Sequence, residues 1–312
     1  MRAIFQWRVL LCAACLLAPL GAAFYAICKC HSSGRLRLGQ IASSHLNDDV
    51  WMSTYKQLHP LWLLAFRILA FSLLLFSLAV KISISGFGIY MYYTQWTFTL
   101  VTVYFGLGSL LSAFGCFCHP QEVRADAQLG IQNSLLEKEK IEAPDFVSYL
   151  FAILFQVYCR NDTVLHCLMR RRFCLMQACA GAVMVTDVVY WCILYPYFTI
   201  KGNDLNLMTI IMHSLNAIFL LCDAALNRMK VSWLGISYFI LWTTAYVVFQ
   251  WILHAFGSMR WPYPFLDLAS PYAPLWYFFF ACLHVVCYGG FKLSRDLLHK
   301  YFCQDAEENT SF

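Results

Sequence analysis

The chain has 312 residues, of which 61% are hydrophobic and only 12% are charged, and its mean hydropathy is +0.59. Soluble domains carry about a quarter charged residues, so this composition excludes a soluble protein and indicates a polytopic membrane protein. The formal net charge of +5 does not point to nucleic acid as a partner, because no basic stripe lies on a soluble domain.

Seven segments are long enough to cross a bilayer, because a spanning helix needs about 20 mostly apolar residues. The first also has features of a signal sequence, since Arg2 and Arg8 precede an apolar stretch that contains the small residues Gly21-Ala22-Ala23. Its length favours a retained helix. We therefore expect an all-α membrane bundle of six core helices plus an N-terminal helix. In chain order the seven segments are 5–27, 61–84, 93–115, 174–197, 206–227, 233–256 and 273–293.

Two features lie between the third and fourth segments. Residues 143–159 form a shorter apolar run, which we interpret as interfacial or re-entrant. Arg170-Arg171-Arg172 stands just before the fourth segment and is typical of a topology anchor that faces anionic lipid. The expected organisation is an N-terminal helix and cytosolic loop over 1–60, a six-helix membrane domain over 61–293 with a cytosolic loop at 116–173, and a short cytosolic tail over 294–312.

Lysine and arginine accumulate in the cytosolic loops of membrane proteins. Assigning alternate loops to two sides places sixteen of the 22 basic residues on one side and five on the other, with Arg67 inside the second segment. The C-terminus is therefore expected in the cytosol, although Arg2 and Arg8 argue mildly against a lumenal N-terminus. The sequons at Asn161 and Asn309 then face the cytosol and should carry no glycan. No address signal is visible, so the endoplasmic reticulum or another endomembrane is the default, with the plasma membrane as an alternative.

Thr94 and His213 each lie near the start of a strongly apolar segment. Polar groups capable of chemistry are costly in hydrocarbon, so residues at this depth are candidates for a functional site. His213 lies about two turns into the fifth segment, on the order of 10 Å below the surface at about 1.5 Å per residue. Both segments enter the membrane from the same side, so we expect the two side chains to meet at similar depth.

This pair is suited to nucleophilic catalysis. A hydroxyl becomes a strong nucleophile when a nearby base takes its proton, and the unperturbed pKa of histidine lies near neutrality. Thr94 is the candidate nucleophile for an acyl carbon, and His213 the candidate base and later acid. Gln95 and Asn216 are candidate substrate-binding residues. Three further hydroxyls on the same segment compete with the first: Thr97, Thr99 and Thr102.

Other interpretations of the polar residues stay open. A membrane threonine often bonds to its own backbone, and a membrane histidine often makes an interhelical hydrogen bond. His213 and His284 are also a possible pair of haem ligands. We expect no cofactor and no metal, because the C-x-C pairs lack the paired histidines of a zinc site. Further polar residues inside the spans are Asp187, Asp223 and His254.

Three stretches in chain order resemble one family over residues 63–293. They are Thr94 with the later Val103-Tyr104-Phe105-Gly106, Met212-His213 with Asp223 ten residues on, and Tyr263-Pro264-Phe265-Leu266-Asp267. These are similar to the androgen-induced membrane protein family, two members of which are threonine hydrolases that split fatty acid esters of hydroxy fatty acids. The resemblance implies a nucleophile at Thr94 and a catalytic histidine at His213.

The chain is nearer still to the rolling-stone-like branch, which holds uncharacterised plant proteins and an insect protein linked to myoblast fusion. The Thr94-Gln95-Trp96-x-Phe98-Thr99 stretch and His213-x-x-Asn216 carry this likeness. The hydrolase members have an apolar residue where His284 stands, and they lack the N-terminal extension.

The leading prediction is hydrolysis of a lipid or fatty acyl ester inside the membrane by Thr94 and His213, without a cofactor. The alternative is a non-enzymatic membrane protein that binds lipid or acts as a fusion-linked adaptor. A seven-helix receptor and a haem-binding electron carrier are further alternatives. Neither the substrate nor the oligomeric state follows from the sequence.

Overall fold

The computed structural model describes residues 7–30, 59–117, 162–198, 207–227, 229–257 and 260–308. Within these ranges the regular structure is helical, and seven helices are long and apolar enough to cross a membrane. The predicted all-α fold is thus confirmed, and the chain is a multi-pass integral membrane protein. The apolar run at 143–159 and the two sequons lie outside the described residues.

The spanning helices begin and end at ordinary capping signals. Helix α2 starts at Pro60, where a missing N–H costs nothing, and the His59 side chain accepts a hydrogen bond from Leu61 N at 3.3 Å. It ends at Gly86, whose φ of 65° suits glycine. The long helices are Trp7–Cys30, α2 (Pro60–Ser85), α3 (Tyr93–Phe117), α6 (Asp162–Val189), α9 (Asn216–Leu226), α10 (Ile236–Phe256) and α11 (Ala273–Glu308).

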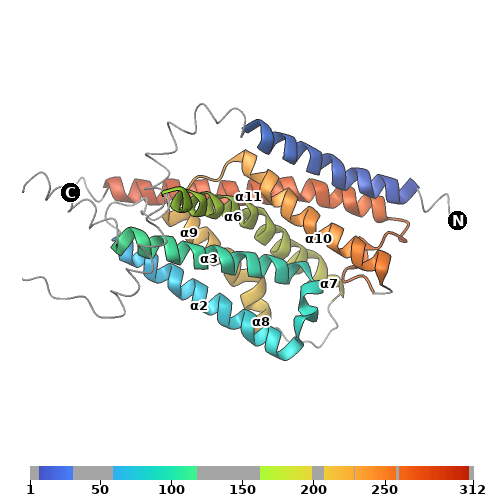
Figure 1. The fold of residues 1–312 in the computed structure, drawn as a ribbon, viewed down its shortest axis with the longest axis horizontal. Helices are drawn as coiled ribbons and strands as arrows, with labels where there is room; N and C mark the ends of the chain where they lie inside the picture. The colour runs from blue at the N-terminus through green and yellow to red at the C-terminus, as the bar shows by residue number, and fades with distance from the viewer. Residues whose placement is uncertain are drawn as a thin grey trace, which may run out of the picture.

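The helices form an elongated bundle (Figure 1). Helix α6 lies at its centre and packs against α3, α10 and α11, while α2 packs against α3 on one side. The N-terminal helix Trp7–Cys30 lies at the margin of the bundle. Only 11% of its most apolar stretch is buried, compared with 61% of the corresponding stretch of α3. The core is therefore built by the six later helices, as expected.

Two helices extend further than the hydropathy pattern predicts. Helix α6 begins at Asp162 rather than near 174, and α11 continues to Glu308 rather than ending near 293. Arg170 and Arg171 are exposed on α6, but Arg172 is fully buried. The topology-anchor interpretation is therefore wrong for Arg172, because the helix turns this residue toward the bundle interior.

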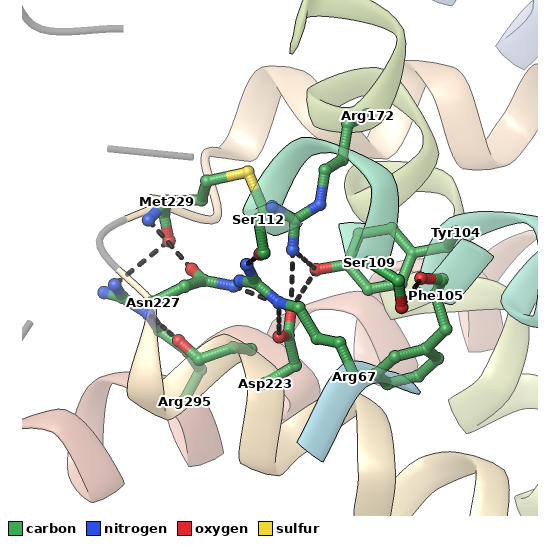
Figure 2. A network of polar contacts seen from close by, with 11 residues as sticks. Arg67, Tyr104, Phe105, Ser109, Ser112, Arg172, Asp223, Asn227, Met229 and Arg295 are labelled. Atoms are coloured by element: carbon green, nitrogen blue, oxygen red, sulfur yellow. Dashed lines mark hydrogen bonds and ion pairs between the residues drawn. The ribbon is translucent and has the colours of Figure 1, made fainter. Parts of the chain in front are cut away.

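Arg172 belongs to a buried ionic cluster (Figure 2). Asp223 on α9 accepts from Arg67 Nε on α2 at 2.6 Å and from Arg172 Nη2 on α6 at 3.2 Å. All three side chains are fully buried. The Tyr104 hydroxyl on α3 also donates to Asp223, as does Asn227 Nδ2 at 2.8 Å. One carboxylate therefore ties four helices together.

The cluster also reaches α11. Arg295 donates from Nη2 to Met229 O at 3.0 Å and from Nε to Ala224 O at 3.3 Å, which joins α11 to the end of α9 (Figure 2). Thr94 lies at the start of α3, whereas Ser112, a hydrogen-bond partner of Arg67, lies near the end of the same helix. The ionic cluster and the predicted Thr94–His213 pair therefore occupy opposite ends of the bundle.

Candidate functional site

Thr94 is held at the first turn of α3 by a tyrosine from a distant loop. Tyr263 lies between α10 and α11, just before the short helix η5 (Pro264–Leu266). Its hydroxyl oxygen accepts a hydrogen bond from Tyr93 N at 3.2 Å and also interacts with the backbone and hydroxyl of Thr94. The first N–H groups of a helix have no partner within the helix, so Tyr263 both caps α3 and places its phenol beside Thr94.

The Tyr263 phenol keeps its proton. Burial raises the pKa of Tyr263 to about 12, and the hydrogen bonds with Thr94 and Tyr93 only partly offset this effect. Burial disfavours the charged phenolate. At neutral pH the phenol is therefore available as a hydrogen-bond donor next to the Thr94 hydroxyl.

His213 lies in a π-helical turn, η3 (Ile211–Leu215), between α8 (Leu207–Ile210) and α9. A second π-helical turn, η2 (Tyr190–Leu194), follows α6, and the Tyr190 ring stacks on the His213 ring at 3.6 Å and 7°. The His213 carbonyl accepts from Trp191 Nε1 at 2.7 Å and from Ser214 Oγ at 2.8 Å. Such turns occur frequently at functional sites, and here two of them together hold one imidazole.

The two residues of the predicted pair line the same cavity. Thr94, Gln95 and His213 all line a cavity of about 500 Å³, together with Tyr190 and Tyr263. Asn216, the other predicted binding residue, does not line it and is fully buried on α9. The structure therefore brings together the predicted nucleophile, the predicted base and one of the two predicted binding residues.

Buried polar atoms without partners gather in this region. Among the described residues, Gln95 Oε1 and His213 Nδ1 have no hydrogen-bond partner. Asp187 lies beside Asn216, and Gln95 Nε2 makes only a sulfur contact, to Met212 Sδ at 3.3 Å. A buried polar atom left unpaired costs about 1–3 kcal/mol, so this region favours a polar guest.

The hydroxyls that compete with Thr94 have other roles. Thr97 Oγ1 is 3.2 Å from Thr186 Oγ1, Thr102 donates to Phe98 O at 2.8 Å, and Thr99 is 3.2 Å from the Tyr90 hydroxyl. In the described part of the chain, none of these three lines the cavity that Thr94 lines. Thr94 is therefore the candidate nucleophile that the fold favours on α3.

A second cavity, of about 240 Å³, lies on the other side of Thr94. It shares Thr94, Tyr263 and Leu194 with the first cavity, and its other walls come from the N-terminal helix, α6, α10 and α11. Thr94 and Tyr263 thus stand at the junction of two cavities of different character.

His284 lines the second cavity and His213 the first. The His284 ring stacks on Phe239 at 4.5 Å, and its Nδ1 lies 2.6 Å from Phe280 O. The structure therefore does not bring His213 and His284 together as a pair of haem ligands. Asp223, ten residues after His213 on the chain, lies in the ionic cluster at the other end of the bundle.

Sequence reasoning missed Tyr190 and the position of Tyr263 in the site. The sequence offered no physical signal for Tyr263, and nothing in the apolar run around Tyr190 marked that residue. A π-helical turn has no sequence signature comparable to a capping box, and a stack between two helices depends on their packing. Asp187, three residues before Tyr190, was the acidic residue nearest to it in the sequence.

Tyr263→Phe is expected to lower the free energy of unfolding by about 1 kcal/mol, because the first turn of α3 loses its acceptor. Amide hydrogen exchange at Tyr93 and Thr94 should accelerate, which mass spectrometry of the protein in detergent measures. Tyr272→Phe is the matched control, since Tyr272 is in the same loop and 66% exposed. Equal exchange rates in the two variants would contradict the capping role.

No family model, no curated protein and no solved structure matches this chain. A function is therefore inferred from the two cavities and the residues that line them.

Proposed function

We propose that this protein is a membrane-embedded lipid ester hydrolase in which Thr94 is the nucleophile and His213 the base. The observation that carries the proposal is that both residues line one cavity, with Thr94 at its junction with a second cavity. A nucleophile and a base that line the same cavity are the minimum that acyl transfer requires.

In the proposed reaction, His213 removes the proton from the Thr94 hydroxyl as Oγ1 attacks the ester carbonyl carbon. The tetrahedral intermediate then expels the alcohol, which takes the proton from His213, and an acyl ester of Thr94 remains. Water attacks this ester with His213 again as the base. The products are a fatty acid and an alcohol, and Thr94 regains its proton.

Two donors support the developing negative charge on the carbonyl oxygen. The Tyr263 hydroxyl already lies beside Thr94 and stays protonated. Gln95 Nε2 has only a weak sulfur acceptor in Met212, so it is free to turn toward a stronger one. Of the two, Tyr263 is already oriented, and such a donor stabilises an oxyanion without reorganisation.

His213 differs from the base of a typical hydrolase triad. Its Nδ1 has no carboxylate partner among the described residues, whereas a triad histidine donates from this atom to an acid. The stack with Tyr190 orients the ring instead. The base is therefore positioned by packing rather than by a charge.

The substrate class and the compartment are part of the proposal. Family resemblance favours fatty acid esters of hydroxy fatty acids. With the C-terminus in the cytosol, as the charge distribution favours, the cavity opens toward the lumenal leaflet of the endoplasmic reticulum or another endomembrane. An ester carbonyl near the headgroup region lies at the depth of this site.

The test is labelling of the membrane-expressed protein with a fluorophosphonate probe, with the modified residue mapped by mass spectrometry. We expect label on Thr94, and its loss in Thr94→Ala and in His213→Ala at matched expression and insertion. Thr99→Ala is the control, because this hydroxyl lies on the same helix outside the cavity. An unlabelled parent protein, or label that persists in Thr94→Ala, would overturn the assignment.

A non-enzymatic lipid-binding protein is the second candidate. The observation that favours it is the cavity of about 240 Å³, whose lining is mostly apolar. Under this alternative the purified protein retains a lipid, yet the probe does not label it.

A further inference from the structure

The smaller cavity has walls from five spanning helices, the N-terminal helix, α3, α6, α10 and α11. Helix α10 contributes Ile240 and Val247, and α11 contributes Phe280 and Ala281. The N-terminal helix completes the enclosure with Cys15, Leu16 and Pro19. The cavity thus runs from the Thr94–Tyr263 junction along the inner face of the N-terminal helix.

Three polar groups on these walls already have partners within the protein. The Thr243 hydroxyl is 2.8 Å from the Tyr93 hydroxyl, Thr186 donates to Ala182 O at 2.8 Å, and His284 Nδ1 is 2.6 Å from Phe280 O. A polar group that already has its partner offers little to a polar guest. The cavity therefore favours an apolar occupant, in contrast to the unpaired atoms near His213 and Gln95.

The N-terminal helix is the least buried of the seven spanning helices. Only 11% of its most apolar stretch is buried, and it lies at the margin of the bundle (Figure 1). Its two faces differ, since Leu16 lines the cavity whereas Leu17 is 57% exposed. On this side of the cavity the lining residues are Cys15, Leu16 and Pro19 of the N-terminal helix.

We propose that this cavity binds one acyl chain, the acid half of the ester, and that the N-terminal helix is the wall that selects the chain. The direction in which the chain lies in the cavity, with its carbonyl toward Thr94, rests on the proposed function. The acyl carbonyl then lies at Thr94 and Tyr263, where the two cavities meet. The alcohol half occupies the larger cavity, which has the unpaired polar atoms.

The experiment uses a fatty acid that carries a diazirine in its chain and an alkyne for detection. It is photolysed with the full-length protein in detergent, in a Thr94→Ala background, so that the readout does not depend on turnover. We expect adducts on the N-terminal helix near Leu16 and on α11 near Ala281. Adducts confined to lipid-facing residues such as Leu17 would overturn the proposal.

Paired variants sharpen the test. Leu16→Trp occupies the space that the chain would take and should reduce labelling roughly tenfold, which corresponds to about 1.4 kcal/mol. Leu17→Trp adds the same group to the outer face and should leave labelling unchanged. If Leu16→Trp fails to fold, Ala281→Leu with the exposed Cys282→Leu as its control tests the opposite wall. Equal labelling within a pair would overturn the proposal.

The outcome separates this proposal from the hydrolase assignment. Photolabelling of the cavity without fluorophosphonate labelling of the parent supports the acyl-chain site and removes the catalytic role of Thr94. Fluorophosphonate labelling of Thr94 without photolabelling of the cavity walls keeps the hydrolase and overturns the acyl-chain site.

Discussion

Ester hydrolysis is expected to fall by about two to four orders of magnitude in kcat when His213 is replaced by alanine, with KM nearly unchanged. The imidazole lies against Tyr190 beside the cavity that Thr94 lines. Its loss leaves the Thr94 hydroxyl without a base, but it removes little of the surface that binds substrate. The effect therefore belongs to the chemical step rather than to binding.

Steady-state hydrolysis of a fatty acyl ester by purified protein measures this effect. Thr94→Ala should lower kcat at least as far, whereas Thr94→Ser, which keeps a hydroxyl, should retain most of the activity. The double variant of Thr94 and His213 should be no slower than the slower single variant, because residues that act as a unit are not additive.

His254→Ala is the control for loss of a histidine. His254 lies on α10 and lines a different cavity, with its ring 3.5 Å from the Trp261 ring. Its replacement should leave kcat unchanged. Hydrolysis at the parent rate in both Thr94→Ala and His213→Ala would contradict the proposed mechanism.

Asp223→Asn is expected to lower the free energy of unfolding by about 3–5 kcal/mol, because it leaves buried guanidinium groups without their carboxylate. Asp223 pairs with Arg67 at 2.6 Å and with Arg172 at 3.2 Å, and all three side chains are fully buried. Thermal or denaturant unfolding in detergent measures the loss. It should appear without any change in kcat per folded molecule, since the ionic cluster lies at the other end of the bundle.

Asp296→Asn provides the comparison with an exposed pair. Asp296 accepts from Lys292 at 2.5 Å, but its side chain is 36% exposed, so its loss should cost about 0–1 kcal/mol. Replacing Arg67, Arg172 and Asp223 together by Met, Met and Leu should cost less than Asp223→Asn alone. A triple variant that is less stable than the single one would show that the pairing itself stabilises the fold.

The seven spans could be predicted from the sequence, but two of their ends could not. Sequence reasoning assigned Arg172 and Arg295 to loops because charged residues usually mark the end of an apolar segment. In the bundle Arg172 meets Asp223, and Arg295 meets backbone carbonyls of Ala224 and Met229. The helices therefore continue through these positions, because partners from other helices compensate the buried charge.

The residues of the candidate site could also be predicted only in part from the sequence. Thr94, Gln95 and His213 were conspicuous as polar residues near the same ends of apolar segments, and the structure places all three on one cavity. Asn216 was predicted with Gln95 as a substrate-binding residue, yet it lies outside the cavity lining. The helix turns it toward Asp187 instead.

By itself the sequence determined the helical class and the position of each span, because in lipid a segment must satisfy its own backbone hydrogen bonds and only an apolar helix of sufficient length does so. The tertiary structure decided which side chains meet. Tyr263 reaches the first turn of α3 across 170 positions of the chain, and Tyr190 stacks on His213 across an interface between helices. Such contacts depend on how the helices pack against one another, which no local pattern encodes.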